Sequence, residues 1–333
     1  MRIAVRGSGI AGGCCAHLLA MQGIAAAVLP AKRPPVPALL LSDAALTLLR
    51  GVFSRPDLFA NHPRIERRVV SWADSEAVSV PHGAVVVSES ELSAALFPAC
   101  TMSERSPEPA DFTIHTISPF PSGELRSFGQ RAAMAAEVHL LHSEDHSACW
   151  VEAVEAGWLF LIPSGGDKAW LLAVGATVEL LMDQSRHVAP RIQLMGRTSS
   201  TFETCPRMLT ALKGEDWLAC GTAAIAFDPI CGDGTAQSIR EAIIAAAVVA
   251  AISEGGDRAA LLTHYESMLI GSMRRHLQLS AQFYESGGRG DWWREQLTAL
   301  SDGHGWCTAR LSVLPEPRYQ LRDFRLMPRE VAA

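Results

Sequence analysis

Few folds accommodate the glycine spacing found at the start of this chain. Arg2–Arg6 is apolar in its middle and predicts a strand, and a helix is expected to follow as far as about Gln22. A second apolar strand, Ile24–Leu29, completes a β-α-β unit. The turn between the first strand and the helix reads Gly7-Ser8-Gly9-Ile10-Ala11-Gly12.

Each glycine of this turn has a physical role in a dinucleotide site. The first allows a tight turn, the second lets the backbone approach a pyrophosphate, and the third lets the helix pack on the strand. The helix N-terminus adds N–H groups and partial positive charge. The unit therefore predicts a Rossmann-like dinucleotide-binding domain, and a glycine-rich turn of an unrelated α/β fold is the alternative.

One expected part of that site is missing. An acid at the end of the second strand normally accepts hydrogen bonds from the ribose hydroxyls. Here the segment from Leu29 to Arg33 reads LPAKR and holds no carboxylate. Either Arg33 or a backbone group is therefore expected to meet the adenosine half. An arginine there also fits the 2′-phosphate of NADP.

A second glycine loop lies far along the chain. Residues 221–236 read GTAAIAFDPICGDGTA and lead into an apolar helix over Thr235–Ser253. Two glycines let backbone N–H groups approach a flat ring, and the helix dipole stabilises negative charge at its edge. This loop resembles the flavin-contacting segment of FAD-dependent monooxygenases and their halogenase relatives, in which GDAA precedes DPxxGxG and a helix.

The resemblance implies that FAD is the cofactor and that this loop wraps its isoalloxazine ring. It carries the FAD-contacting role onto Thr222, Asp228, Pro229, Gly232, Asp233, Gly234, Thr235 and Ala236. Thr222 stands where the family has the aspartate of GDAA, and a hydroxyl binds the ribitol more weakly than a carboxylate does. Arg126 follows Gly123 and resembles a further FAD-adjacent segment of the family.

A central strand carries a third resemblance. Gly157–Pro163 reads GWLFLIP and is similar to the GWxWxIP motif of flavin-dependent halogenases, with Phe160 in place of the second tryptophan. Alternation places Trp158 and Phe160 on one face of this strand. The resemblance implies a flavin and substrate cavity beside Trp158, Phe160 and Pro163, whereas an ordinary apolar strand is the alternative. Flavin-dependent halogenases also need a lysine between flavin and substrate, which lies well before the GWxWxIP motif. No lysine occurs between Lys32 and Lys168 in this chain, so halogenation is not expected.

The C-terminal third resembles one subgroup of these flavoproteins. The matching segments are Arg274–Leu277, Phe283–Gly288, Trp292-Trp293, Tyr319–Leu321 and Phe324–Leu326. The subgroup includes a monooxygenase that hydroxylates a protein tryptophan during tryptophylquinone cofactor maturation. The resemblance implies hydroxylation of an aromatic small molecule or of a Trp in a peptide or protein, through a flavin C4a-hydroperoxide formed from O2. Electrons would come from NAD(P)H or a reductase.

Such chemistry needs positioning more than acid–base groups, so no catalytic residue is assigned. Two alternatives stay open. One is an FAD-dependent dehydrogenase or reductase on the same fold. The other is a flavin-site relic that acts as a non-enzymatic maturation partner, which the missing ribose acid and Thr222 support.

Composition excludes several other classes. The net charge of −6 argues against a nucleic-acid platform. The longest uninterrupted apolar run, Ala242–Ile252, is shorter than the roughly 20 residues of a membrane span. No signal peptide precedes the first strand, and the eight cysteines form no CxxC pair, so a cytoplasmic protein with reduced thiols is expected. His142 and His146 lack a third ligand nearby, and no metal site is predicted.

Together these observations predict an α/β fold with a discontinuous Rossmann-like FAD-binding domain over 1–55, 84–133 and 200–256. A β-rich substrate domain is expected over 56–83 and 134–199, and a C-terminal helical and irregular segment over 257–333. Finer expectations are a helix over Val178–Leu194, a loop over Cys100–Pro109, and a solvated basic face at Arg64, Arg67 and Arg68.

Overall fold

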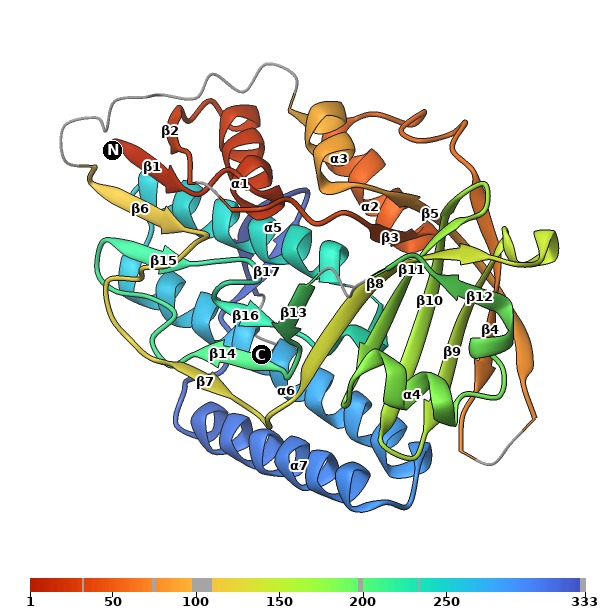
Figure 1. The fold of residues 1–333 in the computed structure, drawn as a ribbon. Helices are drawn as coiled ribbons and strands as arrows, with labels where there is room; N and C mark the ends of the chain where they lie inside the picture. The colour runs from red at the N-terminus through yellow and green to blue at the C-terminus, as the bar shows by residue number, and fades with distance from the viewer. Residues whose placement is uncertain (32, 74–75, 98–109, 197–199, 233, 330–333) are drawn as a thin grey trace.

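The computed structural model describes residues 1–31, 33–73, 76–97, 110–196, 200–232 and 234–329 (Figure 1). A small parallel sheet with the strand order β15-β6-β1-β2 forms one side of the molecule. Ile3 pairs with Ala26 on one neighbour and with Phe112 on the other. The predicted β-α-β unit is therefore confirmed. The elements of this part are β1 (Ile3–Arg6), α1 (Ile10–Met21), β2 (Ala26–Leu29), β6 (Phe112–His115), β15 (Trp217–Ala219) and α5 (Gly234–Ser253).

A larger, mostly antiparallel sheet forms the other side, with the order β12-β8-β11-β10-β9-β4-β5-β3 and β13 beside β8. It contains the predicted β-rich region. Its strands are β3 (Leu39–Ser42), β4 (Arg64–Ser71), β5 (Val78–Val87), β8 (Ala132–Leu140), β9 (Ala148–Val154), β10 (Gly157–Gly165), β11 (Lys168–Val174), β12 (Ile192–Leu194) and β13 (Ser200–Glu203). Strand β5 thus pairs with both β3 and β4, although β3 and β4 lie on either side of the boundary expected near residue 55.

The two faces of this sheet bury different cores. Trp158 and Phe160 of β10 belong to the main core, which is shared with α1, α5 and the small sheet. Leu159 and Leu161 of the same strand belong to a second core beneath α4 (Val178–Gln184). The expected alternation along β10 is confirmed, and it directs the aromatic side chains toward the small sheet.

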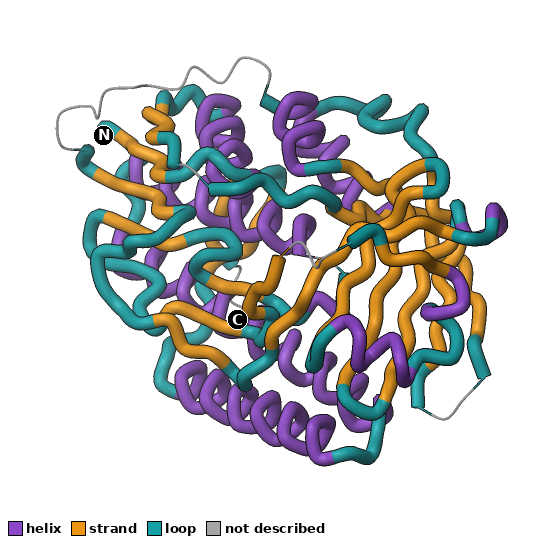
Figure 2. The backbone as a smooth tube through the Cα atoms, viewed as in Figure 1, coloured by secondary structure: helices purple, strands orange, loops and turns teal. Residues whose placement is uncertain are grey.

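Long C-terminal helices close one edge of the molecule, as the blue segments of Figure 1 and the purple ones of Figure 2 show. Trp293 is 1% exposed and fills the space over Gly287 and Gly288, where a Cβ would lie within 2.3 Å of its ring. The remaining elements are α2 (Asp43–Phe53), α3 (Glu89–Leu96), α6 (Arg258–Gly287), α7 (Asp291–Ser312), β7 (Leu125–Ser127), β14 (Arg207–Leu209), β16 (Ile225–Ala226), β17 (Tyr319–Arg322) and β18 (Arg325–Pro328).

The helix expected over Val178–Leu194 is wrong beyond Gln184. The buried carboxylate of Glu152, on β9, accepts hydrogen bonds from the backbone N–H groups of Arg186 (2.7 Å), His187 (3.0 Å) and Val188 (2.8 Å). These contacts draw the backbone out of the helix after α4. A distant side chain thus overrides the local pattern.

The predicted solvated face is also wrong for two of its three arginines. Arg64 is exposed and pairs with Asp43, but Arg67 and Arg68 are half-buried. Arg67 donates to the carbonyl oxygen of Glu144 at 2.9 Å, and Arg68 lies over the ring of Phe160. The loop expected over Cys100–Pro109 lies outside the described residues.

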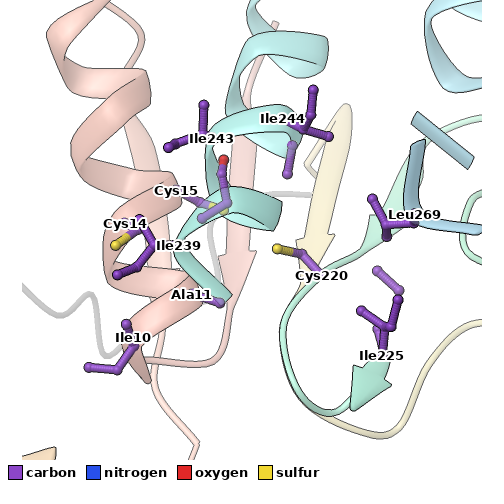
Figure 3. Packing of buried hydrophobic residues seen from close by; sticks show 14 of the residues in the cluster. Ile10, Ala11, Cys14, Cys15, Cys220, Ile225, Ile239, Ile243, Ile244 and Leu269 are labelled. Carbon is purple, nitrogen blue, oxygen red and sulfur yellow. The ribbon is translucent and has the colours of Figure 1, made fainter. Parts of the chain in front are cut away.

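One described helix, α5, is long and apolar enough to cross a membrane by length and composition. Its most apolar window is 83% buried inside the fold, against α1 and α6. In this structure α5 is therefore a core helix. Figure 3 shows Ile239 and Ile243 of α5 packed beside Cys14 and Cys15 of α1.

Candidate functional site

The first glycine loop follows β1 and has little room for side chains. Gly7 adopts φ +110°, and a Cβ there would lie 2.3 Å from Thr116 Oγ1. A Cβ on Gly12 would lie 2.1 Å from the carbonyl oxygen of Gly7. Both positions therefore require glycine for packing. The side chains of Ile10 and Ala11 are buried, so only their backbone could meet a ligand.

Gly9 differs from its two neighbours in the motif. It has an ordinary φ of −74°, and a Cβ there would meet only the ends of two side chains, Arg33 Nη2 at 3.3 Å and Glu89 Oε1 at 3.7 Å. As the N-cap of α1, Gly9 offers no side chain to the first N–H groups, and the first turn contains no acid. Ser8 beside it is half-buried. The N–H groups of this helix end and the Arg33 guanidinium together form a site suited to a phosphate.

The second glycine loop lies directly against the first. A Cβ on Gly221 would lie 2.8 Å from the Cβ of Ala11, and Gly221 has φ +80°. The N–H of Gly221 donates to Glu241 Oε2, which lies beneath the loop, at 2.9 Å. Thr222, the next residue, is exposed and is available to a ligand that lies on this edge of the sheet. The structure thus joins two motifs that are more than two hundred residues apart in sequence.

Asp228 points into the protein rather than toward a ligand. Its Oδ2 accepts hydrogen bonds from Arg131 Nη2 at 2.7 Å and from the Tyr284 hydroxyl at 2.9 Å. Its Oδ1 accepts from the N–H of Ile230 at 3.0 Å. Burial raises the pKa of this carboxyl, and the Arg131 guanidinium opposes that rise. Asp228 therefore anchors the second loop from below.

The anchor extends into two long helices and the aromatic strand. Trp158 Nε1 donates to the Tyr284 hydroxyl at 3.2 Å, and the N–H of Asp228 donates to His276 Nε2 at 2.7 Å. Burial lowers the pKa of His276 to about 3, so the ring is neutral and can accept this bond. Arg131 stands in none of the motifs described above. His276 and Tyr284 lie in C-terminal segments that resemble the subgroup, but the sequence did not assign them to the cofactor site.

Arg68 brings positive charge to the end of the second loop. Its Nη2 lies 3.3 Å from the position that a Cβ on Gly232 would take, and its guanidinium lies 5.9 Å from the Phe160 ring centre. It also lies 3.2 Å from His82 Nε2, and burial lowers the pKa of His82. Within the described parts of the chain, no carboxylate is within ion-pair distance of Arg68. Among the described residues this half-buried cation has no counter-charge, and such a group is suited to an anionic ligand.

The remaining residues of the second glycine loop differ in how far they are exposed to solvent. Gly234, at the start of α5, is exposed, and a Cβ there would meet no described atom within 4 Å. Pro229 and Thr235 are half-buried, whereas the Ala236 side chain is fully buried. Asp233 lies outside the described residues. The exposed backbone of this segment is therefore what a flat ring could approach.

The described contacts do not join two further predicted site residues to either glycine loop. Pro163 pairs with Ala169, whose side chain belongs to the second core, so it lies on the face of β10 opposite Trp158 and Phe160. Arg126 is on β7, and its guanidinium lies 5.3 Å from the Trp306 ring centre on α7. Both residues were assigned from short sequence similarity, which does not fix the strand face or the helix that a side chain meets.

The residues present fit FAD. The bare Gly9 and the uncapped helix end suit the pyrophosphate, the exposed Thr222 suits the ribitol, and Arg68 with the α5 N-terminus suits a ring that carries negative charge when reduced. The described lysines lie apart from these groups, since Lys168 is exposed in the β10–β11 hairpin and Lys213 pairs with Glu266 at 3.5 Å.

Solved flavoenzyme structures share this fold. The chain superposes on peptidyl tryptophan dihydroxylase QhpG, essential for tryptophylquinone cofactor biogenesis, with a TM-score of 0.70 and 18% identity over 99% of this chain and 86% of that one. For the flavin-dependent halogenase CmlS the values are 0.77 and 15%, over 93% and 71%. For a mutant of the halogenase PltM in complex with FAD they are 0.66 and 12%, over 95% and 86%.

No protein-family model and no curated protein sequence matches the chain. The structural likeness alone therefore shows that the chain has the fold of FAD-dependent monooxygenases and flavin-dependent halogenases, as the sequence resemblance predicted.

Proposed function

We propose that this protein is an FAD-dependent monooxygenase that hydroxylates an aromatic substrate, namely a Trp side chain in a peptide or protein. The observation that carries the proposal is the contact between the two glycine loops, in which Gly221 lies against Ala11. Two motifs chosen independently for contact with one cofactor meet at one sheet edge. Support for the substrate comes from the likeness to a peptidyl tryptophan dihydroxylase over nearly the whole chain.

In this proposal FAD, when bound, supplies the activation of O2. The residues of the chain bind and orient it. The α1 N-terminus and Arg33 hold the pyrophosphate, Thr222 holds the ribitol, and the backbone of Gly232 and Gly234 approaches the ring. Arg68 stabilises negative charge at that ring, and Phe160 presents an aromatic face beside it. NAD(P)H or a reductase supplies the electrons.

The buried anchor beneath the loop excludes water from one side of this site. Trp158, Tyr284 and Asp228 are at most 2% exposed and form a hydrogen-bonded layer under the second loop. A dry, fixed wall suits oxygen transfer, because water would otherwise break down the activated oxygen. We also assign the protein to the cytoplasm, because the seven described cysteines form no disulfide with one another.

A flavin titration and a product assay test the proposal. Purified protein is titrated with FAD, and the bound complex is then given NAD(P)H or chemical reductant, O2 and Trp-containing peptides. A peptide mass gain of one or two oxygens supports the proposal. Oxidation of NAD(P)H without any oxygenated product supports a dehydrogenase or reductase instead. Failure to bind FAD at all supports the non-enzymatic partner.

A matched pair of variants checks that binding uses the first glycine loop. Gly9→Val keeps an allowed backbone and displaces only the end of Arg33, but it blocks approach of the pyrophosphate. Gly51→Val, at an open position of α2, is the control. We expect Gly9→Val to lose FAD binding while both variants fold. Unchanged FAD affinity in Gly9→Val would refute this placement of the cofactor.

A further inference from the structure

The acid that the sequence lacks after β2 has a counterpart elsewhere in the fold. Glu89, the first residue of α3, lies beside the first glycine loop, with its Oε1 3.7 Å from the position of a Cβ on Gly9. We infer that Glu89 is the carboxylate that binds the adenosine ribose of FAD. The inference rests on the proposed function and names a residue that the usual motif does not contain.

The position of Glu89 suits a carboxylate that binds ribose. Gly9 is the residue at which the backbone approaches the pyrophosphate, so a carboxylate beside it also borders the path of the adjoining ribose. Arg33, shortly after β2, occupies the region where the acid is normally found, and it pairs with Glu89 through both terminal nitrogens. The Arg33 Nη1 to Glu89 Oε2 distance is 2.9 Å. The carboxylate beside Gly9 thus comes from the start of α3 instead of the end of β2.

The Glu89 carboxylate also has hydrogen-bond capacity for a ligand. Glu89 accepts two bonds from Arg33 and one from the N–H of Val36, at 2.8 Å. An ionised carboxylate has about four lone-pair sites, so the contacts among the described residues leave one acceptor site for a ribose hydroxyl. The side chain is only 8% exposed, and the arginine offsets much of the cost of burying its charge.

Helix capping does not account for Glu89. The cap of α3 is formed by Ser88 and Glu91, since the Ser88 hydroxyl accepts from the N–H of Glu91, and Glu91 Oε2 accepts from the N–H of Ser88 at 2.7 Å. Glu91 is the exposed acid of this turn, and Glu89 is the buried one. The buried acid therefore holds Arg33 and Val36 rather than capping α3.

The paired charges also decide between ligands. An arginine after β2 by itself fits a 2′-phosphate. A carboxylate bound to that arginine accepts hydrogen bonds from free ribose hydroxyls and repels a phosphate in their place. The Arg33–Glu89 pair is therefore suited to the unphosphorylated ribose of FAD. Among the described contacts Arg33 donates through Nη1 and Nη2 only, which leaves its Nε–H for the pyrophosphate.

The test compares FAD with FMN, which lacks the adenosine. Both dissociation constants are measured by flavin fluorescence for wild type, Glu89→Ala, Glu89→Gln and the control Glu91→Ala, which loosens the start of α3 without touching Glu89. We expect Glu89→Ala to lower the ratio of FAD to FMN affinity about 10- to 100-fold. Glu89→Gln, which can still accept from Val36, falls between Glu89→Ala and wild type, and Glu91→Ala leaves the ratio unchanged.

Competition by ADP gives a second readout, because ADP carries the adenosine ribose without the flavin. Its inhibition constant against FAD should rise in Glu89→Ala by a similar factor. An unchanged ratio, or an equal loss of FAD and FMN, would overturn the inference while leaving the proposed function intact. Wild-type protein that binds neither flavin would overturn both.

Discussion

Breaking the buried ion pair beneath the second glycine loop should lower the free energy of unfolding by a predictable amount. Arg131 and Asp228 have 0% side-chain exposure and meet at 2.7 Å. Replacing Arg131 with methionine keeps much of the apolar volume but leaves the Asp228 carboxyl buried without its cation. Breaking one partner of a buried pair costs about 3–5 kcal/mol of unfolding free energy. Arg131 also donates to Gln296 at 3.0 Å, and that bond is lost as well.

The size of this loss should depend on pH. Burial already raises the pKa of Asp228, and Arg131 opposes the rise, so removing Arg131 raises that pKa further. A carboxyl whose pKa is higher in the folded state than in the unfolded state binds protons preferentially when folded. The stability deficit of Arg131→Met, relative to wild type, is therefore larger at pH 8 than at pH 5.5.

Urea unfolding followed by circular dichroism measures the effect at both pH values. Arg294→Met is the control, because Arg294 forms an exposed pair with Asp291 on α7, where a salt bridge contributes about 0–1 kcal/mol. A deficit for Arg131→Met no larger than that of the control would refute the assignment of a buried, charged anchor. An equal deficit at both pH values would show that Asp228 does not respond to the lost cation.

Other predictions concern groups around the same site. Burial raises the pKa of Glu241 to about 8, so stability falls as pH rises from 6.5 to 8, and Glu241→Gln should flatten that slope in urea unfolding. This window lies above the range in which His276, whose pKa is lowered to about 3, affects stability. Arg68→Met should lower the reduction potential of bound FAD by about tens of millivolts, as expected for the loss of one nearby positive charge. Spectroelectrochemistry measures this potential, and an unchanged value would contradict the position of Arg68 beside the flavin ring. Trp293→Ala should cost about 3–5 kcal/mol of stability, because the ring is buried against Gly287, and a much smaller loss on urea unfolding would contradict that packing.

The parts of the fold that the sequence predicts are those governed by local geometry. Gly7 and Gly12 mark the first loop, because Gly7 adopts a φ of +110° and the carbonyl oxygen of Gly7 excludes a Cβ on Gly12. Alternation along β10 predicts which face carries Trp158 and Phe160, because side chains of a strand point to opposite sides in turn. In each case, neighbouring residues contain the whole physical cause.

The parts that the sequence misses depend on contacts between distant residues. The helix after Thr177 ends early because Glu152 of β9 captures the backbone N–H groups that follow it. Short motifs placed Arg126 and Pro163 in the site, yet their described partners are Trp306 of α7 and Ala169 of β11. Arg131 was overlooked for the converse reason, since nothing near it in sequence indicates that its partner is Asp228.

The missing ribose acid illustrates the same principle and changes how the chain is interpreted. Judged from residues 29–33 alone, the site has lost an anchor, which favours a relic without flavin. In space, the Glu89 carboxylate lies beside Gly9 although it is 56 residues from its partner Arg33. Hydrogen bonding to a ribose depends on where a carboxylate lies, whichever element supplies it. Under the proposed role of Glu89, the absence of an acid after β2 is no argument against FAD binding, and of the two altered anchors only Thr222 favours the relic.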